Sequence, residues 1–579
     1  MSAPKAASGN GSRWPGMGVI ATSLLASAAP ASAQVLADAI YTNGVIRTME
    51  APDDVAQAVA IRQGRILAVG ATQAMLAHRG SGTRVVDLQG KTMLPGFIDA
   101  HGHLSMLAGM VDFANLSPPP VAGVRDIASL QATLRAYVAD RATPTGQWVL
   151  GFGYDDAALA ERRHPTRHDL DAVSADRPIM LLHASGHIAA ANTRALELAG
   201  LLNDVPNPAG GVIRREADGK TASGILEEAA MYRLMALLPK PTFEQRLAAL
   251  QKAQHIYAGY GITTAQDGAA SPDDYALLKA ADERGALTID VGALLFFRAP
   301  WQDLESMPIG QSRQTRLRIL GIKLMLDGSP QGRTAWLKEP YHHVPDGRAA
   351  DYHGYRQMED AELRGWIDRA ADHNWQLFAH VNGDAAMQQL IDVTAAADAA
   401  RPKRVERTIA IHSQVVGAGQ LARMKELDIQ PSFFAAHAFY WGDWHRDVTL
   451  GEVRAAQISP MRDAIDLGLV PSIHNDAPVV PPDMMRLIWA AVTRTTRSGA
   501  TLGTAEAATP YEALLMSTRN AAWQIHEEKE KGTIAVGKQA DLVVLDADPL
   551  KVDPAKLHAI KIDRTISDGT EIYTATHKK

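Results

Sequence analysis

The chain has 579 residues, of which 46% are hydrophobic and 21% are charged, and its formal net charge is -6. This composition is typical of folded globular proteins and excludes a largely disordered chain. A small net negative charge gives no basic field for a phosphate backbone, so we expect a small-molecule substrate and no nucleic-acid partner.

The N-terminus has the pattern of a secretory signal peptide. Lys5 and Arg13 precede the apolar stretch MGVIATSLLASAAPASAQ, which is too short to span a bilayer and contains an Ala-Ser-Ala site at 31–33. These are the features of a cleaved leader, and the alternative is a mildly apolar disordered tail. We expect residues 1–33 to be removed, and the mature protein to be exported, periplasmic or secreted, without membrane contact.

Both ends of the remaining chain predict β-structure. Residues 34–90 run in short apolar pieces separated by Asn-Gly and Gln-Gly pairs, which are typical of hairpin turns. Residues 530–579 show a similar sequence pattern, in GTIAVGKQADLVVLD and IDRTISDGTEIYTA. Two unrelated extensions would each expose their edges, so we expect the two segments to form one composite β-sandwich domain.

Residues 91–529 alternate between strand-like and helix-like segments. After a long gap behind the first strand, a helix begins at Thr242 with a Thr-x-x-Gln capping pattern. The expected strands are 95–103, 261–268, 288–297, 318–328, 375–384, 407–413, 429–437 and 469–478, and the expected helices include 242–261, 271–285, 358–374, 384–400, 418–428 and 459–468. This α/β alternation predicts a (β/α)8 TIM-like barrel, with functional side chains at the carboxyl ends of the strands. Residues 104–241 would form an insertion between the first two strands, with its own helices and strands.

Metal-competent side chains occur where several of these strands end. His101 and His103 are two residues apart, so on a strand both imidazoles point the same way. Later strands carry similar residues at the same end: Lys323, His380, His412 and Asp476. Each alone is compatible with a satisfied core residue, but closure of a barrel brings all of them to one mouth. The chain contains no cysteine, so a metal ion there would be held by histidine and carboxylate.

The chain resembles the amidohydrolase superfamily and, within it, amidohydrolase family 3. The matching stretches, in order, are PGFIDAHGHL, GIKLMLDGSPQGRTA, LFAHVNGDAAMQQLI, IAIHSQ, HNDAPV and GTIAVGKQADLVVLDADP. They extend over nearly all of the mature chain. The resemblance implies a metal-dependent hydrolase whose barrel carries a β-sandwich built from both chain ends.

The resemblance also implies a metal centre with two ions. His101 and His103 would be ligands of one ion, and His380 and His412 ligands of the second. We expect two zinc ions, while imidazole and carboxylate ligands also suit manganese, cobalt or iron.

Lys323 would bridge the two ions after its amine has been carboxylated by carbon dioxide. A buried ion pair with Asp327 or Asp99 is the alternative. Asp476 matches the family's aspartate after the eighth strand, which contacts the metal centre and transfers protons during catalysis. An N-cap of the following helix is the alternative for Asp476. Asp99 is also a candidate to orient a ligand imidazole.

Four residues are candidates for contact with the substrate. His437 and Trp441 lie in the aromatic segment FFAAHAFYWGDWH after the seventh strand, which predicts an apolar or aromatic substrate moiety. Packing of these aromatic side chains on the insertion is the alternative. His187, in HASGH, resembles a family stretch that approaches the active site, although an ordinary core or loop histidine is the favoured interpretation. His474 is an extra imidazole before Asp476, where many relatives have a different residue.

Together these features predict an exported, metal-dependent amidohydrolase that cleaves an amide or N-acyl C–N bond with metal-activated hydroxide. Hydrolysis of an ester, carbamate or organophosphate at the same centre is the first alternative, and a metal-assisted isomerase or lyase is another. A non-catalytic binding protein on a retained barrel predicts a broken ligand set, but none of the six positions is missing. A homo-oligomer is compatible with the sequence, which shows no legible interface.

Overall fold

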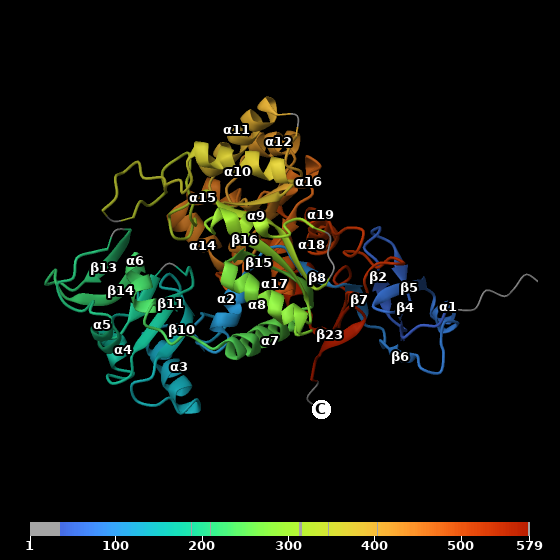
Figure 1. Cartoon of the computed structure of the whole chain (residues 1–579), viewed down its shortest axis with the longest axis horizontal. Helices are drawn as coiled ribbons and strands as arrows, with labels where there is room; N and C mark the ends of the chain where they lie inside the picture. Colours follow the sequence, from blue (N-terminus) through green and yellow to red (C-terminus); the bar gives the residue numbers. More distant parts are fainter. Residues whose placement is uncertain are drawn as a thin grey trace, which may run out of the picture.

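The computed structural model describes residues 35–576, apart from residues 187, 209, 312–314, 346 and 402. The predicted signal segment, residues 1–33, lies outside the described residues. Figure 1 shows a central α/β body with a β-rich part on each side. One side part contains segments from both ends of the chain, and the other is the insertion that follows the first barrel strand.

The central body is a parallel sheet of eight strands that curves into a nearly closed barrel, as the sequence predicts. Its neighbouring strands pair in parallel in the order β21-β20-β19-β18-β17-β16-β15-β8. The strands are β8 (Phe97–Asp99), β15 (Ile262–Ala270), β16 (Asp290–Phe296), β17 (Leu317–Met325), β18 (Gln376–Val381), β19 (Thr408–His412), β20 (Ile429–Phe433) and β21 (Ser472–Ile473). Their carboxyl ends all meet at one mouth, because every pairing is parallel.

Helices follow the strands and cover the outside of the barrel (Figure 1). They are α7 (Phe243–Gly259), α8 (Pro272–Glu283), α9 (Trp301–Ser306), α10 (Asp360–His373), α11 (Asp384–Ala400), α12 (Ala418–Glu426), α13 (His437–Tyr440), α14 (Gly442–Trp444), α15 (Gly451–Ala456), α16 (Met461–Asp466), α17 (Met484–Thr493), α18 (Pro510–Met516) and α19 (Arg519–Gln524). The capping box expected at Thr242 is confirmed, since its side chain accepts from the Gln245 N–H and the Gln245 side chain accepts from the Thr242 N–H. No helix within the described ranges is long and apolar enough to cross a membrane.

A short seam closes the barrel between β8 and β21, which do not form a regular ladder. The Asp476 N–H donates to the His101 carbonyl at 3.0 Å, and the His103 N–H donates to the Ala477 carbonyl at 2.7 Å. The Asn475 N–H adds a bond of 3.0 Å to the Asp99 carboxylate. These three bonds place the residues after the first and eighth strands side by side.

The insertion builds a second sheet of its own, in the order β13-β14-β12-β11-β10-β9. Its elements are α2 (Leu104–Met110), β9 (Ala114–Asn115), α3 (Ile127–Asp140), β10 (Val149–Tyr154), α4 (Arg167–Asp171), β11 (Ile179–His183), β12 (Ile188–Ala191), α5 (Thr193–Leu198), β13 (Gly211–Arg215), β14 (Ala222–Glu228) and α6 (Ala229–Met235). Two separate hydrophobic clusters fill the two faces of this sheet. The insertion therefore has a core distinct from that of the barrel.

Two smaller sheets lie at the opposite side of the barrel (Figure 1). A four-stranded sheet contains β1 (Ala39–Thr42), β4 (Ala58–Arg62), β5 (Arg65–Gly70) and β6 (Arg84–Asp87), with α1 (Thr72–Leu76) beside it. A six-stranded sheet contains β2 (Val45–Arg47), β3 (Val55–Ala56), β7 (Thr92–Pro95), β22 (Leu542–Leu545), β23 (Ile562–Ser567) and β24 (Thr570–Thr574). In the second sheet β7 pairs with β22, so strands from both chain ends share one sheet. Tyr41, Met93 and Leu542 belong to a hydrophobic cluster that joins the two sheets.

A buried charge cluster ties the barrel to the six-stranded sheet. The Lys531 ammonium, on a side chain only 2% exposed, contacts Asp290 of β16, lies 3.2 Å from Glu527, and donates to Thr264 of β15 at 2.9 Å. Asp541, just before β22, lies 3.8 Å away. Two arginines share the balance of these buried carboxylates, because Arg316 lies 3.1 Å from Asp290 and Arg318 lies 3.3 Å from Glu527.

We expect Lys531→Met to destabilise the protein by about 3 kcal/mol, the lower end of the cost of breaking a buried ion pair, because Asp290 and Glu527 keep their arginine partners. The urea midpoint and melting temperature would measure the effect. Lys529→Met is the matched control, since Lys529 is exposed two residues away. Equal stability of the two variants would contradict a structural role for the cluster.

Candidate metal centre

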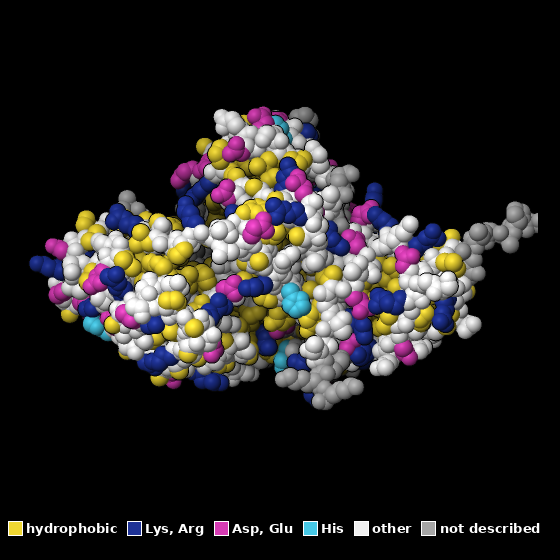
Figure 2. All heavy atoms as spheres, turned by 60° about the horizontal axis from the view of Figure 1, so that its bottom comes forward, with side chains coloured by type: hydrophobic (Ala, Val, Ile, Leu, Met, Phe, Trp, Pro, Cys, Tyr) yellow, Lys and Arg dark blue, Asp and Glu magenta, His cyan; other side chains and the backbone are white. Residues whose placement is uncertain are grey.

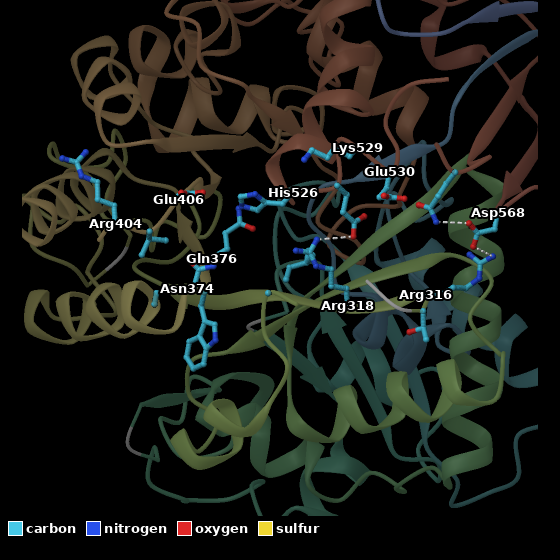
Figure 3. A pocket seen from close by; sticks show the side chains of 18 of the residues that line it. Arg316, Arg318, Asn374, Gln376, Arg404, Glu406, His526, Lys529, Glu530 and Asp568 are labelled. Carbon is cyan, nitrogen blue, oxygen red and sulfur yellow. Dashed lines mark hydrogen bonds and ion pairs between the residues drawn. The ribbon is translucent and has the colours of Figure 1, made fainter. Parts of the chain in front are cut away.

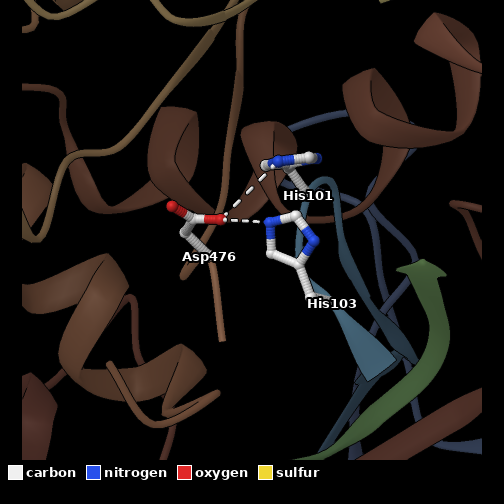
Figure 4. A group of neighbouring side chains, drawn as sticks. All are labelled: His101, His103 and Asp476. Carbon is white, nitrogen blue, oxygen red and sulfur yellow. Dashed lines mark ion pairs between the residues drawn. The ribbon is translucent and has the colours of Figure 1, made fainter. Parts of the chain in front are cut away.

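His101, His103 and Asp476 form the tightest group of potential ligands at the barrel mouth. Figure 4 shows their side chains converging from the ends of β8 and β21. The His103 Nε2 atom lies 3.2 Å from Asp476 Oδ1, and His101 Nε2 lies 3.6 Å from the same oxygen. One ligand atom from each of the three residues lies within 4.8 Å of the other two, a spacing that a metal ion can occupy.

Gly268 of β15 leaves the space that the His101 ring needs. A Cβ atom at residue 268 would overlap the His101 ring and lie 2.8 Å from its Nδ1 atom. The Gly268 N–H also donates to the Gly102 carbonyl at 2.7 Å, which holds β15 against the His101 turn. The orientation of His101 therefore depends on glycine at this position.

His380 and His412 form a second pair, on the neighbouring strands β18 and β19. His380 Nε2 lies 3.1 Å from the Gly328 carbonyl and 3.0 Å from the Asn382 side-chain amide nitrogen. The other nitrogen, Nδ1, lies 3.0 Å from His412 Nε2. Two imidazole nitrogens at this distance share a proton or a cation, so the pair fits a metal ion.

The protein supports a cation-binding form of His412 through a chain of hydrogen bonds. His412 Nδ1 lies 3.1 Å from His474 Nε2, and His474 Nδ1 lies 2.9 Å from Ser432 Oγ. With a proton on each Nδ1, His412 donates to His474 and His474 donates to Ser432, which leaves His412 Nε2 free to bind. Such outer hydrogen bonds fix the tautomer and the orientation of ligand histidines.

Lys323 lies between the two histidine groups. Its Nζ atom is 3.1 Å from His101 Nε2, and its side chain is buried inside the barrel. Within the described part of the chain Lys323 makes no ion pair with Asp327 or Asp99. Burial lowers the pKa of Lys323 to about 7, so a neutral amine is available near neutral pH.

Asp476 is the carboxylate of the centre, and its backbone has a positive φ angle. Burial favours its protonated form, but the close approach of His103 opposes burial and the pKa of Asp476 stays below its usual value. Its φ angle is 58°, and that of His412 is 74°, both in the left-handed region that costs about 1–3 kcal/mol for such residues. Strain at two of the predicted ligands is typical of a functional site.

Asp327 and Asp99 bind backbone amides and not Lys323. Asp327 accepts from the N–H groups of Asn382 at 2.9 Å and Gly383 at 2.7 Å, just after β18. It thereby fixes the loop that follows His380. Asp99 accepts from the Asn475 N–H at the barrel seam. Burial raises the pKa of each of these two carboxyls to about 7.

The residues predicted to contact the substrate differ in how deeply they are buried. His474 is fully buried behind His412, and His437 is buried with its Nδ1 atom 3.0 Å from His445 Nε2. Trp441 lines a cavity beside the centre. His187 lies outside the described residues.

A cavity of about 270 Å³ lies beside the metal-competent residues, between the barrel mouth and the insertion. It is lined by residues next to the centre, including Leu107 and Val479, and by apolar and aromatic groups such as Phe113, Phe152 and Trp441. On the metal centre itself, His103 and His380 keep 18% and 15% of their side chains exposed, while His101 and His412 are buried. The centre is therefore reached from the side of His103 and His380.

A further cavity, about 740 Å³, lies at the other end of the barrel and is shown in Figure 3. Its lining includes Arg318 and Gln376 near the amino ends of β17 and β18. Its arginines are paired, Arg316 with Asp568 at 3.1 Å and Arg318 with Glu527 at 3.3 Å. Size alone is a poor guide, because functional residues of such barrels gather at the carboxyl ends of the strands.

Several polar residues near the mouth were not predicted from the sequence. Ser432 on β20 completes the chain behind His412, but a lone serine in a strand gives no sequence signal. Asp155 and Asp156 form a second group with His183, the first histidine of the HASGH stretch, at the ends of β10 and β11. The run GFGYDD, in which two acidic residues directly follow an apolar strand, could have indicated this group from the sequence.

Comparisons with known proteins agree with this geometry. The family model described as "Amidohydrolase family" matches residues 84–573. An N-substituted formamide deformylase of Arthrobacter pascens is 30% identical over 551 residues, which cover 93% of this chain and 99% of the relative. The putative amidohydrolase YtcJ of Bacillus subtilis is also 30% identical, over 92% of this chain and 99% of its own.

Solved structures give the same result. An uncharacterised metal-dependent hydrolase from Pyrococcus furiosus superposes with a TM-score of 0.70 at 26% identity, covering 89% of this chain and 100% of its own. A second one, from Pyrococcus horikoshii, has a TM-score of 0.71 at 25% identity, with 89% and 99% covered. The chain belongs to the amidohydrolase family. It is a metal-dependent hydrolase of carbon–nitrogen bonds other than peptide bonds, which confirms the class predicted from the sequence.

We expect Gly268→Ala to lower the amount of divalent metal that copurifies with the protein, because the added methyl group displaces the His101 ring. Elemental analysis of the purified variant would measure this. Gly365→Ala on α10 is the control, since a Cβ at residue 365 meets no atom within 4 Å. Wild-type metal content in Gly268→Ala would contradict a ligand role for His101.

Proposed function

We propose that the protein hydrolyses an amide or N-acyl C–N bond in a small molecule with an apolar or aromatic part. The observation that carries this proposal is the convergence of His101, His103 and Asp476, whose ligand atoms lie within 4.8 Å of one another at the barrel mouth. The relative named as an N-substituted formamide deformylase makes a formyl group the first acyl group to test.

We propose that the centre holds two divalent ions, most simply zinc. His101 and His103 would hold one ion, and His380 and His412 the other. Lys323 would bridge them as a carbamate, formed when its neutral amine attacks carbon dioxide and loses a proton. Burial supports this step, since it lowers the pKa of Lys323 to about 7.

Bound ions of this kind activate water for attack at neutral pH and polarise a carbonyl. Asp476 is the group of this chain suited to proton transfer, because the pKa of its carboxyl is lowered and the carboxylate can accept a proton at neutral pH. We infer that Asp476 takes a proton from the attacking water and delivers it to the leaving nitrogen. His474 would act through His412 as a positioning residue, given their contact at 3.1 Å.

The apolar lining of the cavity beside the centre supports the substrate class. Trp441 and Tyr440, with Phe113 and Phe152 from the insertion, present aromatic faces to the same space. Small-molecule sites combine such walls with a few polar groups. The substrate would place its apolar part there and its acyl carbon at the centre.

Other expectations from the sequence stay proposals. We propose export to the periplasm or the medium, which the leader pattern in residues 1–33 supports, and a mature protein that has no membrane or nucleic-acid partner. Figure 2 shows basic and acidic side chains interleaved on the face it displays. We also propose that the two outer sheets form one β-sandwich domain, because they share a hydrophobic cluster and strands from both chain ends.

The function is tested with a matched amide and ester, N-formylphenethylamine and phenethyl formate. We expect the zinc-supplied enzyme to release phenethylamine from the amide, and Asp476→Asn to lower kcat about 10²–10⁴-fold, the usual contribution of a general acid–base group. Asp466→Asn is the control, because Asp466 is an exposed carboxylate on α16. Hydrolysis of the ester alone would favour the ester alternative, and full activity of Asp476→Asn would remove Asp476 from the mechanism.

The metal content tests the role of Lys323. We expect about two divalent ions per chain, and one or fewer in Lys323→Ala, because the bridging ligand is lost. Lys338→Ala controls for the lost charge, since Lys338 is exposed. An unchanged ion count in Lys323→Ala would return Lys323 to a structural role.

A further inference from the structure

Arg497 lies at the neck between two adjoining cavities near the metal centre. The inner cavity, about 270 Å³, is lined by Leu107 and Val479, whose N–H groups donate to the carbonyls of His103 and Asp476, and the outer cavity has about 480 Å³. Five residues line both cavities: Pro118, Asp155, Tyr440, Trp441 and Arg497. A molecule that moves from the outer to the inner cavity therefore passes the Arg497 guanidinium.

Arg497 makes no hydrogen bond to any residue that the structure describes. Its Nε atom is fully buried without a partner. The nearest acid is Asp155, whose Oδ2 atom lies 4.0 Å from the Arg497 guanidinium, beyond hydrogen-bond distance. The Tyr440 ring lies 5.2 Å from the guanidinium carbon and provides a cation–π contact.

Arg494, three residues earlier, shows what a structural arginine looks like in this protein. It is completely buried and donates to the carbonyls of Leu502 and Ile458 at 2.7 Å and to that of Ser459 at 3.3 Å. Burying charged donors without acceptors costs free energy, so native proteins satisfy them. Arg497 instead keeps 23% of its side chain exposed where the two cavities adjoin and, in the described ranges, has only Asp155 at 4.0 Å, so its guanidinium is available to a ligand.

The group of Asp155, Asp156 and His183, on the other side of the neck, is a weaker candidate for binding a ligand. Asp155 Oδ1 accepts from the Ala157 N–H at 3.0 Å, which holds that carboxylate in its turn. Asp156 lies 3.0 Å from His183 Nε2. The Ser185 N–H donates to His183 Nδ1 at 3.0 Å, so His183 carries its proton on Nε2 and faces Asp156 as a donor. His183 therefore faces Asp156 with its protonated nitrogen and does not present a metal-binding lone pair to the two carboxylates.

We propose that Arg497 is a specificity-determining residue that binds a carboxylate on the substrate. The planar guanidinium fork matches a carboxylate in two parallel hydrogen bonds. The inner cavity around it is lined by apolar groups such as Leu107, Phe113 and Val479. The preferred substrate then combines an apolar body, a carboxylate and the scissile C–N bond. This inference rests on the proposed function for the bond that is cleaved.

Binding is the primary test, because it does not depend on turnover. Phenylacetate and its neutral isostere phenylacetone would be titrated calorimetrically into the zinc-loaded protein. We expect the wild type to bind phenylacetate about tenfold or more tightly than phenylacetone, the gain typical of charge-assisted hydrogen bonds. Arg497→Met should lose this preference, with phenylacetone affinity changed by less than about threefold. Arg497→Lys should keep part of it.

Two controls sharpen the result. Arg162→Met removes an exposed arginine that lines the outer cavity and should leave the preference intact. Melting temperatures of all variants show whether Arg497→Met folds, and Arg497→Lys keeps the test valid if it does not. A preference that survives in Arg497→Met places the carboxylate at the metal centre and overturns the proposal. Equal affinity of the wild type for both ligands, or measurable binding of neither, also overturns it.

Turnover separates this inference from the proposed function. With N-formylphenylalanine and N-formylphenethylamine, Arg497→Met should lower kcat/KM for the acid about tenfold or more, mainly through KM, and leave the neutral amide nearly unchanged. Hydrolysis of both amides without a carboxylate preference rejects the role of Arg497 and leaves the proposed function standing. A carboxylate preference in binding without hydrolysis of either amide rejects the proposed function and leaves the role of Arg497 standing.

Discussion

The metal centre depends on the seam that closes the barrel between its first and last strands. Two backbone hydrogen bonds, from Asp476 to His101 and from His103 to Ala477, hold together segments that are more than 370 residues apart in the sequence. These bonds bring Asp476 within 3.2 Å of His103. The seam therefore creates the site as well as the barrel, and the left-handed backbone of Asp476 is the local cost of closing it.

Desolvation gives the centre its chemical character. Burial lowers the pKa values of His101, His412 and Lys323, so these groups are neutral at a pH where they would otherwise be charged or partly charged. Neutral imidazole and neutral amine are the forms that offer lone pairs. Asp476 remains ionised beside them. A set of neutral donors with one carboxylate accepts a divalent cation readily, whereas protonated histidines and lysine would repel it.

The sequence predicted the barrel and the convergence of its polar residues because both follow from local patterns. Strand and helix periods locate the eight strands, and the position of His101 or Lys323 at the carboxyl end of a strand determines the mouth to which each belongs. The parallel order of the strands then places His380 beside His412, as found. The alternation of strands and helices is a regular pattern, and such a pattern can be recognised in a single sequence.

Other features could not be predicted because they depend on contacts between distant segments. The balance of Lys531 against Asp290 and Asp541 requires the relative position of the barrel and the six-stranded sheet. The partner of His474 is Ser432, a residue with no distinguishing motif. Arg497 lies in TRTTRSG beside Arg494, and only the folded structure shows that Arg494 donates to three carbonyls while Arg497, among the described residues, has only Asp155 at 4.0 Å.

The residues suited to the reaction and the residues suited to substrate selection lie in different parts of the structure. Lys323, His380 and His412 lie near the ends of regular parallel strands, where hydrogen bonds on both sides fix the backbone. His101, His103 and Asp476 lie just beyond the first and last strands, at the hydrogen-bonded seam. The residues at the neck lie instead in loops and in the insertion, where Asp155 and Arg497 approach from different parts of the chain. Loops tolerate change that strands do not. The same barrel can therefore keep one hydrolytic centre while its neck accepts different substrates, and Arg497 is the charged side chain that this chain places where the two cavities adjoin.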